Sequence, residues 1–292
     1  MITQFIVNGV IAGSVYALVA LGFSLIYGTV RFFHFAHGAI YTLGAYLAFS
    51  FFVMFHFSFV PSVVIAVVLA GLVGMAIELV IYRPMRRRKA SNTVLLVASL
   101  GLLIVLQNVI SLVFGDATKT IRQGSFGPGY DVVGARITSI QAIIIGVSIG
   151  LCLLTWVILR FTRFGRRVRA VANDSNLSAI VGVDTDRVIL LAFAFGSALA
   201  AGAAILISLD TDITPTMGFG ALLMGVVAAI VGGVGSIPGA MLGGLLVGLA
   251  QQLGVSKLPT QWQDAIVFLI LIAFLIARPQ GFLGKALKST GV

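Results

Sequence analysis

The sequence predicts an all-α fold, a polytopic integral membrane bundle of about eight to ten transmembrane segments, some of them discontinuous. Of its 292 residues, 59% are hydrophobic and only 10% are charged. A soluble domain of this size carries about 25% charged residues. The polar segments are short, so we expect residues 1–292 to form a single transmembrane domain. Any module that captures solute or converts energy must then belong to another chain.

Apolar runs long enough to cross a bilayer follow one another along the whole chain. A spanning helix needs roughly 20 predominantly apolar residues. The seventh and eighth runs are short and rich in glycine, which leaves the number of crossings open. The predicted segments are residues 5–28, 37–55, 59–82, 92–114, 139–159, 188–209, 218–232, 237–255 and 262–277.

Clusters of arginine and lysine predict which loops share a face of the membrane. Short cytoplasmic loops carry an excess of these residues. Residues 83–89 contain five of them and residues 160–187 contain six, and the tail adds Arg278, Lys285 and Lys288. The loop at 115–138 balances three basic residues with two acids, so we place it on the outer face. The N-terminus is then outside and the C-terminus cytoplasmic.

The motifs of catalysis and metal binding are missing from the sequence. It contains no GxxxxGK[ST] phosphate loop and no GxSxG nucleophile elbow. Cys152 is the single cysteine, and His34 and His37 share a helical spacing without a further ligand cluster. We therefore expect a protein that is not an enzyme and needs no cofactor or metal. We do not expect nucleic-acid binding despite the net charge of +10, because the basic residues cluster just beyond apolar runs, where they set orientation.

Two acids lie close to the ends of predicted spans. Glu78 is one turn from the basic loop, where it can pair with Arg83 or reach the interface. Asp264 opens the last span, where a carboxylate is favoured by the helix dipole. Neither lies at the bilayer midplane, so a proton-coupled transporter would lack its relay.

Two glycine-rich stretches, residues 28–46 and 232–248, interrupt the helical pattern in the two halves of the chain. Paired broken helices are typical of a transport site, although small residues also allow helices simply to pack closely. The polar residues within the spans are mostly neutral, which suits a solute of zero net charge. The candidate translocation residues are His37, Gly38, Tyr41, Gly44, Gly235 and Gly239.

The longest polar stretch, RFTRFGRRVRAVANDSNLSAIVGVDTDR at residues 160–187, lies between two spans. It holds six arginines and three aspartates among helix-forming residues. It could fold as a short helix outside the membrane and contact a soluble partner. The alternative is a solvated loop that only sets orientation.

Five motifs resemble one family in collinear order, over almost the whole chain. The sequence is similar to the LivH-type permease of bacterial branched-chain amino-acid ABC importers, although His34 stands where that family has Asn. The motifs are NGVIAGSVYALVALGFSLIYGTV, FAHGAIYTLGAY, ELVIYRPMR, GVDTDRVI and GGVGSIPGAMLGGLL.

The resemblance implies a set of partners in the bacterial inner membrane. These are a second, LivM-type permease, two cytoplasmic ATPase subunits and a periplasmic solute-binding protein. The solute would be a branched-chain amino acid, driven by ATP hydrolysis on the partner chains. In the family the loop at 160–187 holds the coupling helix that docks on an ATPase subunit. The matching positions are Ala170, Ala172, Asn173, Asp174, Ala179 and Gly182.

Two alternatives remain open from the sequence. A stand-alone channel would transport without nucleotide. A sister importer for urea, short amides or another small neutral solute would share every motif quoted above.

Overall fold

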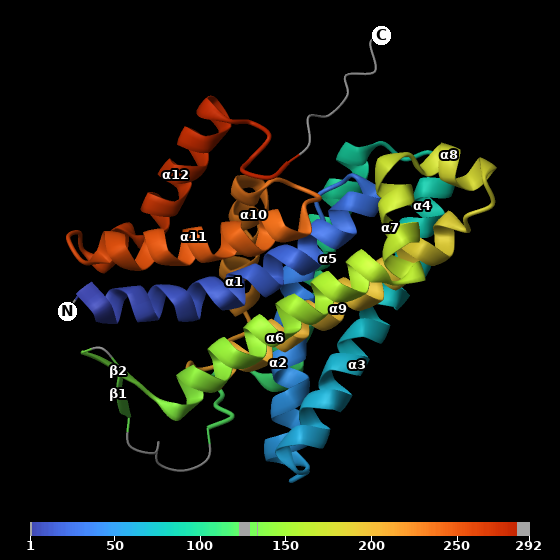
Figure 1. Ribbon diagram of the computed structural model, residues 1–292. Helices are drawn as coiled ribbons and strands as arrows, with labels where there is room; N and C mark the ends of the chain where they lie inside the picture. The colour runs from blue at the N-terminus through green and yellow to red at the C-terminus, as the bar shows by residue number, and fades with distance from the viewer. Residues whose placement is uncertain (1, 123–128, 133, 285–292) are drawn as a thin grey trace.

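The computed structural model describes residues 2–122, 129–132 and 134–284. Each of the nine predicted segments is a helix, which confirms the all-α membrane fold (Figure 1). Within these described residues, eight helical stretches are long and apolar enough to cross a membrane, and the shorter α10 is also apolar. The main helices are α1 (Ile2–Val30), α2 (Ala36–Phe49), α3 (Phe59–Ile77), α5 (Asn92–Phe114), α6 (Ser139–Phe161), α9 (Thr185–Ser208), α10 (Met217–Gly232), α11 (Ile237–Val255) and α12 (Gln263–Ala277).

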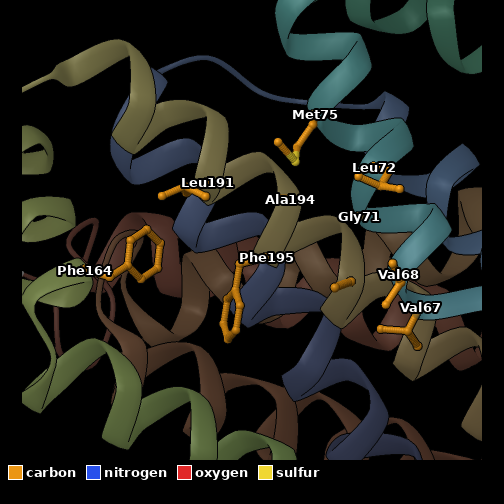
Figure 2. Close-up of a pocket in the computed structure, with 10 residues that line it drawn as sticks. Val67, Val68, Gly71, Leu72, Met75, Phe164, Leu191, Ala194 and Phe195 are labelled. Carbon is orange, nitrogen blue, oxygen red and sulfur yellow. The ribbon is translucent and has the colours of Figure 1, made fainter. Parts of the chain in front are cut away.

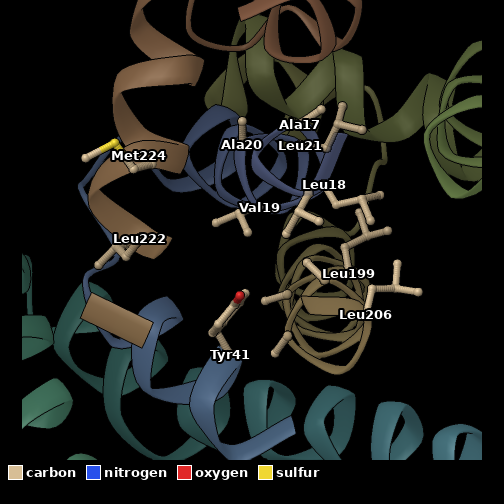
Figure 3. Packing of buried hydrophobic residues seen from close by; sticks show 14 of the residues in the cluster. Ala17, Leu18, Val19, Ala20, Leu21, Tyr41, Leu199, Leu206, Leu222 and Met224 are labelled. Carbon is tan, nitrogen blue, oxygen red and sulfur yellow. The ribbon is translucent and has the colours of Figure 1, made fainter. Parts of the chain in front are cut away.

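Helix α1 lies at the centre of the bundle and packs against α9, α10 and α11. It runs antiparallel to α11, with Gly9 against Leu249 and Gly13 against Leu245. A Cβ on Gly248 would overlap the backbone of Gly13. Figure 3 shows α1 side chains such as Val19 packed between α9 and α10. The glycines therefore allow the backbones to approach more closely than larger residues would permit.

Helix α2 begins inside the bundle, beside Gly22 of α1. Residues 31–35 leave the end of α1 and turn back into the interior. The amide of Ala36 donates to the Ser99 hydroxyl at 3.1 Å, and His37 packs against Gly22 of α1. The first helix break is therefore at residues 31–35. The second, between α10 and α11, covers residues 233–236.

The third helix continues beyond its apolar part through a π-helical turn (Glu78–Tyr82) into α4 (Arg83–Arg87). Glu78 is 1% exposed and pairs with Arg86, so the predicted pairing with Arg83 is wrong. Arg83 instead forms an ion pair with Asp186 in the first turn of α9, at 2.7 Å. Eight residues are about two helical turns, which brings Arg86 onto the face of Glu78.

The remaining elements are short. A second π-helical turn (Ser50–Met54) extends α2, and a 3₁₀ turn (Thr260–Trp262) precedes α12. Strands β1 (Tyr130–Val132) and β2 (Ala135–Ile137) form an antiparallel hairpin, which the sequence did not predict. Two polar helices, α7 (Arg163–Asn173) and α8 (Ser175–Ile180), connect α6 to α9.

Hydrogen bonds between polar side chains join three of the helices. The Tyr16 hydroxyl of α1 donates to Gln251 of α11 at 2.9 Å. The amide nitrogen of Gln251 in turn lies 3.3 Å from a carboxylate oxygen of Asp264. Asp264 is in the first turn of α12, as predicted. These polar side chains thus pair between helices, as polar residues within a membrane bundle usually do.

The loops gather at two ends of the bundle. At one end, which we call the basic end, residues 83–89 lie beside residues 160–187 through the ion pairs of Asp186 with Arg83 and Arg87. At the opposite end, Gln4 exchanges hydrogen bonds with the backbone of Arg136.

The remaining loops also make contacts near the ends of the helices. Lys119 and Ile213 pair through their backbones near the hairpin end. The amide of Phe282 returns to the carbonyl of Val231, beside the turn between α10 and α11. Lys285 and Lys288 lie outside the described residues. The grouping of the basic loops therefore agrees with the sequence pattern.

The close contact between α1 and α11 leads to a stability prediction. Gly248→Ala should destabilise the folded protein by about 1–3 kcal/mol, because the added methyl overpacks a backbone contact. The matched control is Gly101→Ala on α5, where a Cβ meets nothing within 4 Å. Thermal unfolding in detergent measures both variants. Equal melting temperatures for the two variants would contradict the packing described here.

Candidate functional site

Residues 160 and 161 end α6, and the rest of the 160–187 stretch forms two short helices and the first turn of α9. The loop is therefore helical as the sequence suggested, with two short helices in place of one. The Thr162 hydroxyl caps α7 by accepting from the Gly165 amide at 3.2 Å. One face of α7 is buried through Val168 and Val171, while most of its arginines are exposed. This amphipathic pattern places α7 on the surface of the bundle with its charged face outward.

Asp174 forms the joint between α7 and α8. Its extended backbone ends α7, and its carboxylate caps α8 by accepting from the Leu177 amide at 2.9 Å. Its amide donates to the carbonyl of Ala170, and its carbonyl accepts from Ser178. Asp174 thereby sets the angle between the two helices.

Gly182 ends α8. Its φ of +85° is a conformation that favours glycine, and its amide donates to the carbonyl of Ala179 at 3.1 Å. Four of the predicted coupling residues, Ala170, Asp174, Ala179 and Gly182, therefore build the frame of the helix pair. Asn173 is exposed at the end of α7.

Three exposed apolar side chains lie at α8, and the sequence reasoning missed them: Leu177 and Ile180 in the helix, and Val181 directly after it. Their exposed fractions are 56%, 81% and 70%. They lie outside the eight spanning stretches, in the polar loop, so lipid is not their expected environment. We call these three residues the α8 patch. Exposed apolar clusters bounded by polar residues mark contact sites for other proteins. Their occurrence in an otherwise polar loop is the signal that could have revealed them.

Polar contacts tie the helix pair to the rest of the bundle. The Arg31 guanidinium donates to the carbonyl of Ala172, the remaining predicted coupling residue. At the other side, Asp186 accepts from Arg83 and Arg87 of α4. The pair is thus attached to α1 and to α4.

The candidate translocation residues of α2 are all buried. Gly38 packs its backbone on Gly218 of α10, and Gly44 packs on Ala201 of α9. The Tyr41 side chain points between α1, α9 and α10 (Figure 3). His37 has no exposed surface. A solute can reach these groups only if the helices move apart.

The two candidate residues of the second break lie between α10 and α11 and in the first turn of α11. Gly235 is exposed with a φ of +83°, and Gly239 packs against the carbonyl of Gly232 at the end of α10. Helix α10 touches both groups, because its first turn meets Gly38 and its last residue meets Gly239. The structure therefore connects the two breaks through α10.

His34 lies just before α2, so it does not share a helix face with His37. Its Nδ1 is 3.0 Å from the Tyr82 hydroxyl, and the ring centroids of the two histidines are 6.0 Å apart. Among the described residues no group of three or more His, Cys, Asp or Glu side chains could hold a metal ion.

An apolar groove of about 420 Å³ opens between α3, α7 and α9 (Figure 2). Its walls include Met75, Phe164 and Leu191. Every lining residue is apolar or glycine. Because a zwitterion needs partners for its ammonium and carboxylate, this groove does not serve as an amino-acid site.

Comparison with known proteins shows the family to which the chain belongs. The family described as the permease component of branched-chain amino acid transport systems matches residues 5–275. The permease LivH of Escherichia coli K12 is 37% identical over 97% of this chain and 95% of its own length. The permease BraD of Pseudomonas aeruginosa is also 37% identical, with the same coverage.

A solved structure, PsaBC from Streptococcus pneumoniae in complex with Fab, aligns with 96% of this chain and 91% of its own. Its TM-score of 0.46 and identity of 17% are too low to support an argument. The family match and the two bacterial relatives, which span nearly the full length, decide the assignment. The chain therefore belongs to the family of permease components of branched-chain amino acid transport systems.

Proposed function

We propose that this chain is the membrane-spanning permease subunit of an ATP-driven importer in a bacterial inner membrane, and that its solute is a branched-chain amino acid. The observation that carries the proposal is the α8 patch, an exposed apolar surface on a polar loop that is attached to the central helix. Membership of the permease family supports a role in transport across a membrane. The names of LivH and BraD, which refer to branched-chain amino acid transport, support the solute class.

The α8 patch is the contact surface for a cytoplasmic ATPase subunit in this proposal. Asp174 and Gly182 hold α8 at a fixed angle, so Leu177 and Ile180 project into solvent. The exposed arginines of α7 add a positive field next to the patch. Two such subunits would supply ATP hydrolysis, and this chain would contribute the transport path alone.

The opposite end of the bundle is the proposed outer face, so the N-terminus lies outside and the C-terminus is cytoplasmic. The hairpin end brings together residues 115–122 and 209–216 through the pairing of Lys119 with Ile213. Arg122 and Asp212 form an ion pair on the same surface. A periplasmic solute-binding protein would dock there and release its solute between this permease and a related LivM-type partner.

The solute path follows the two helix breaks. His37, Gly38, Tyr41 and Gly44 border the first, and Gly235 and Gly239 border the second. Polar groups without fixed negative charge suit a zwitterion, since a broken helix offers free amides to its carboxylate and free carbonyls to its ammonium. These side chains are buried here, so ATP-driven motion of the helices must open the path. The whole chain acts as one transmembrane permease unit.

Docking can be tested at the α8 patch. The double variant Leu177→Ser, Ile180→Ser should weaken association with the ATPase at least about tenfold, because burial of each side chain contributes about 1.5–3 kcal/mol. Co-purification from detergent and solute uptake in proteoliposomes measure the effect. Leu258→Ser, at an exposed position near the opposite end, is the matched control. The assignment fails if the double variant, and likewise Asn173→Ala with Asp174→Ala, leave both association and uptake unchanged.

The solute can be tested with the assembled importer and its binding protein. Leucine, isoleucine and valine should be taken up in an ATP-dependent manner and should displace one another from the binding protein. Urea and acetamide should not compete. Competition by urea or acetamide with no effect of leucine would instead identify an importer for small neutral amides. Uptake by the chain alone without ATP would identify a channel.

A further inference from the structure

Arg31 occupies a backbone conformation that ordinarily favours glycine. Its φ is +59°, at the residue directly after α1. Its amide still donates to the carbonyl of Tyr27 at 2.8 Å, which completes the last turn of the helix. Most helices that end with a positive φ use glycine at this position. A large cationic side chain here suggests a role that glycine would not supply.

The Arg31 side chain reaches across to the end of α7. Its guanidinium donates to the carbonyl of Ala172, in the last turn of that helix. The last four carbonyls of a helix have no partner within it, and the negative end of the helix dipole favours a cation there. Ala172 also lies near Gly28 of α1, where an added Cβ would be 3.9 Å from the Ala172 methyl. Arg31 therefore joins the end of the central helix to the turn from which α8 departs.

The residues that follow Arg31 lead directly into the first helix break. Phe32 is buried against Tyr82, with ring centroids 4.9 Å apart. His34 lies 3.0 Å from the Tyr82 hydroxyl, and α2 begins two residues later at Ala36. Only four residues, 32–35, lie between Arg31, which contacts α7, and the start of α2.

We propose that Arg31 is a positioning residue that transmits motion of the α7–α8 helix pair to the broken start of α2. The inference rests on the proposed function, because it assumes that the helix pair moves with an ATPase. The guanidinium holds α7 to the chain segment that enters the bundle, so displacement of α7 shifts residues 31–35. His37 and Gly38, which follow at once, are the first residues of the proposed solute path.

A glycine substitution separates the role of the side chain from that of the backbone. Arg31→Gly keeps the positive φ without strain but removes the guanidinium. Arg31→Lys keeps a cation that can approach the same carbonyl. Lys89→Gly is the matched control, because Lys89 also has a positive φ (+58°) at the basic end. Among the described residues its side chain makes no hydrogen bond or ion pair.

The experiment uses the assembled importer with its binding protein in proteoliposomes. It measures ATPase association, ATP hydrolysis and leucine uptake for each variant. Arg31→Gly should retain association and hydrolysis but transport about tenfold less leucine per ATP, the factor that corresponds to loss of a hydrogen bond to a charged group. Arg31→Lys should recover part of the loss, and Lys89→Gly should match the wild type.

Two results would overturn the inference. Wild-type uptake per ATP in Arg31→Gly would show that Arg31 only completes a turn. Loss of ATPase association in that variant, with an unchanged melting temperature, would show that Arg31 acts on docking and not on transmission. Failure of the proposed function looks different, because the wild-type chain itself would then not bind an ATPase or take up leucine.

Discussion

The rest of the structure depends on the close backbone contact of α1 with α9, α10 and α11. Apolar helices in a bilayer gain little from burying apolar surface, since the lipid is equally apolar, and so they associate through tight packing. Gly13 and Gly248 supply that packing between α1 and α11, and Gly22 and Gly196 supply it between α1 and α9. Because α1 is fixed in this way, its end at Val30 is a fixed point for the segments that follow.

Three functional parts are positioned relative to that end. The last turn of α7 lies near Gly28 of α1 and accepts a hydrogen bond from Arg31, the residue after α1. Helix α2 starts inside the bundle, and its N-terminal residues meet the first turn of α10 through Gly38 and Gly218. The far end of α10 meets the second helix break at Gly239. In the proposed function, motion of the α7–α8 helix pair would reach both breaks through these packed contacts.

The sequence predicted the helices well because membrane insertion demands long apolar runs. The segment boundaries at 92–114 and 237–255 agree with the structure, and the basic loops gather at one end as their charges indicated. A short helix in residues 160–187 was also expected from their helix-forming composition, and the structure has two, α7 and α8.

The sequence could not show which residues of distant segments pair with each other. Glu78 pairs with Arg86, while Arg83 pairs with Asp186, 103 positions along the chain. The hairpin at 130–137 carries only a short β pattern, which gave no signal among the glycines of its loop. The exposure of the α8 patch could not be predicted, because the sequence does not show which helix faces remain uncovered in the folded protein. The link from Arg31 to Ala172 spans 141 positions and depends on a local backbone turn that no pattern encodes.

Proximity of α8 to an ATPase is the central claim, and cysteine cross-linking measures it most directly. Cys152 is the single native cysteine and is buried, so a cysteine introduced at Ile180 would be the accessible one. In membranes that hold the assembled importer, a short bifunctional reagent should join Ile180→Cys to the ATPase, and a change of cross-linking yield should follow ATP addition. Leu258→Cys, near the opposite end, should give no product. Cross-linking at position 258 but not at position 180 would contradict the account.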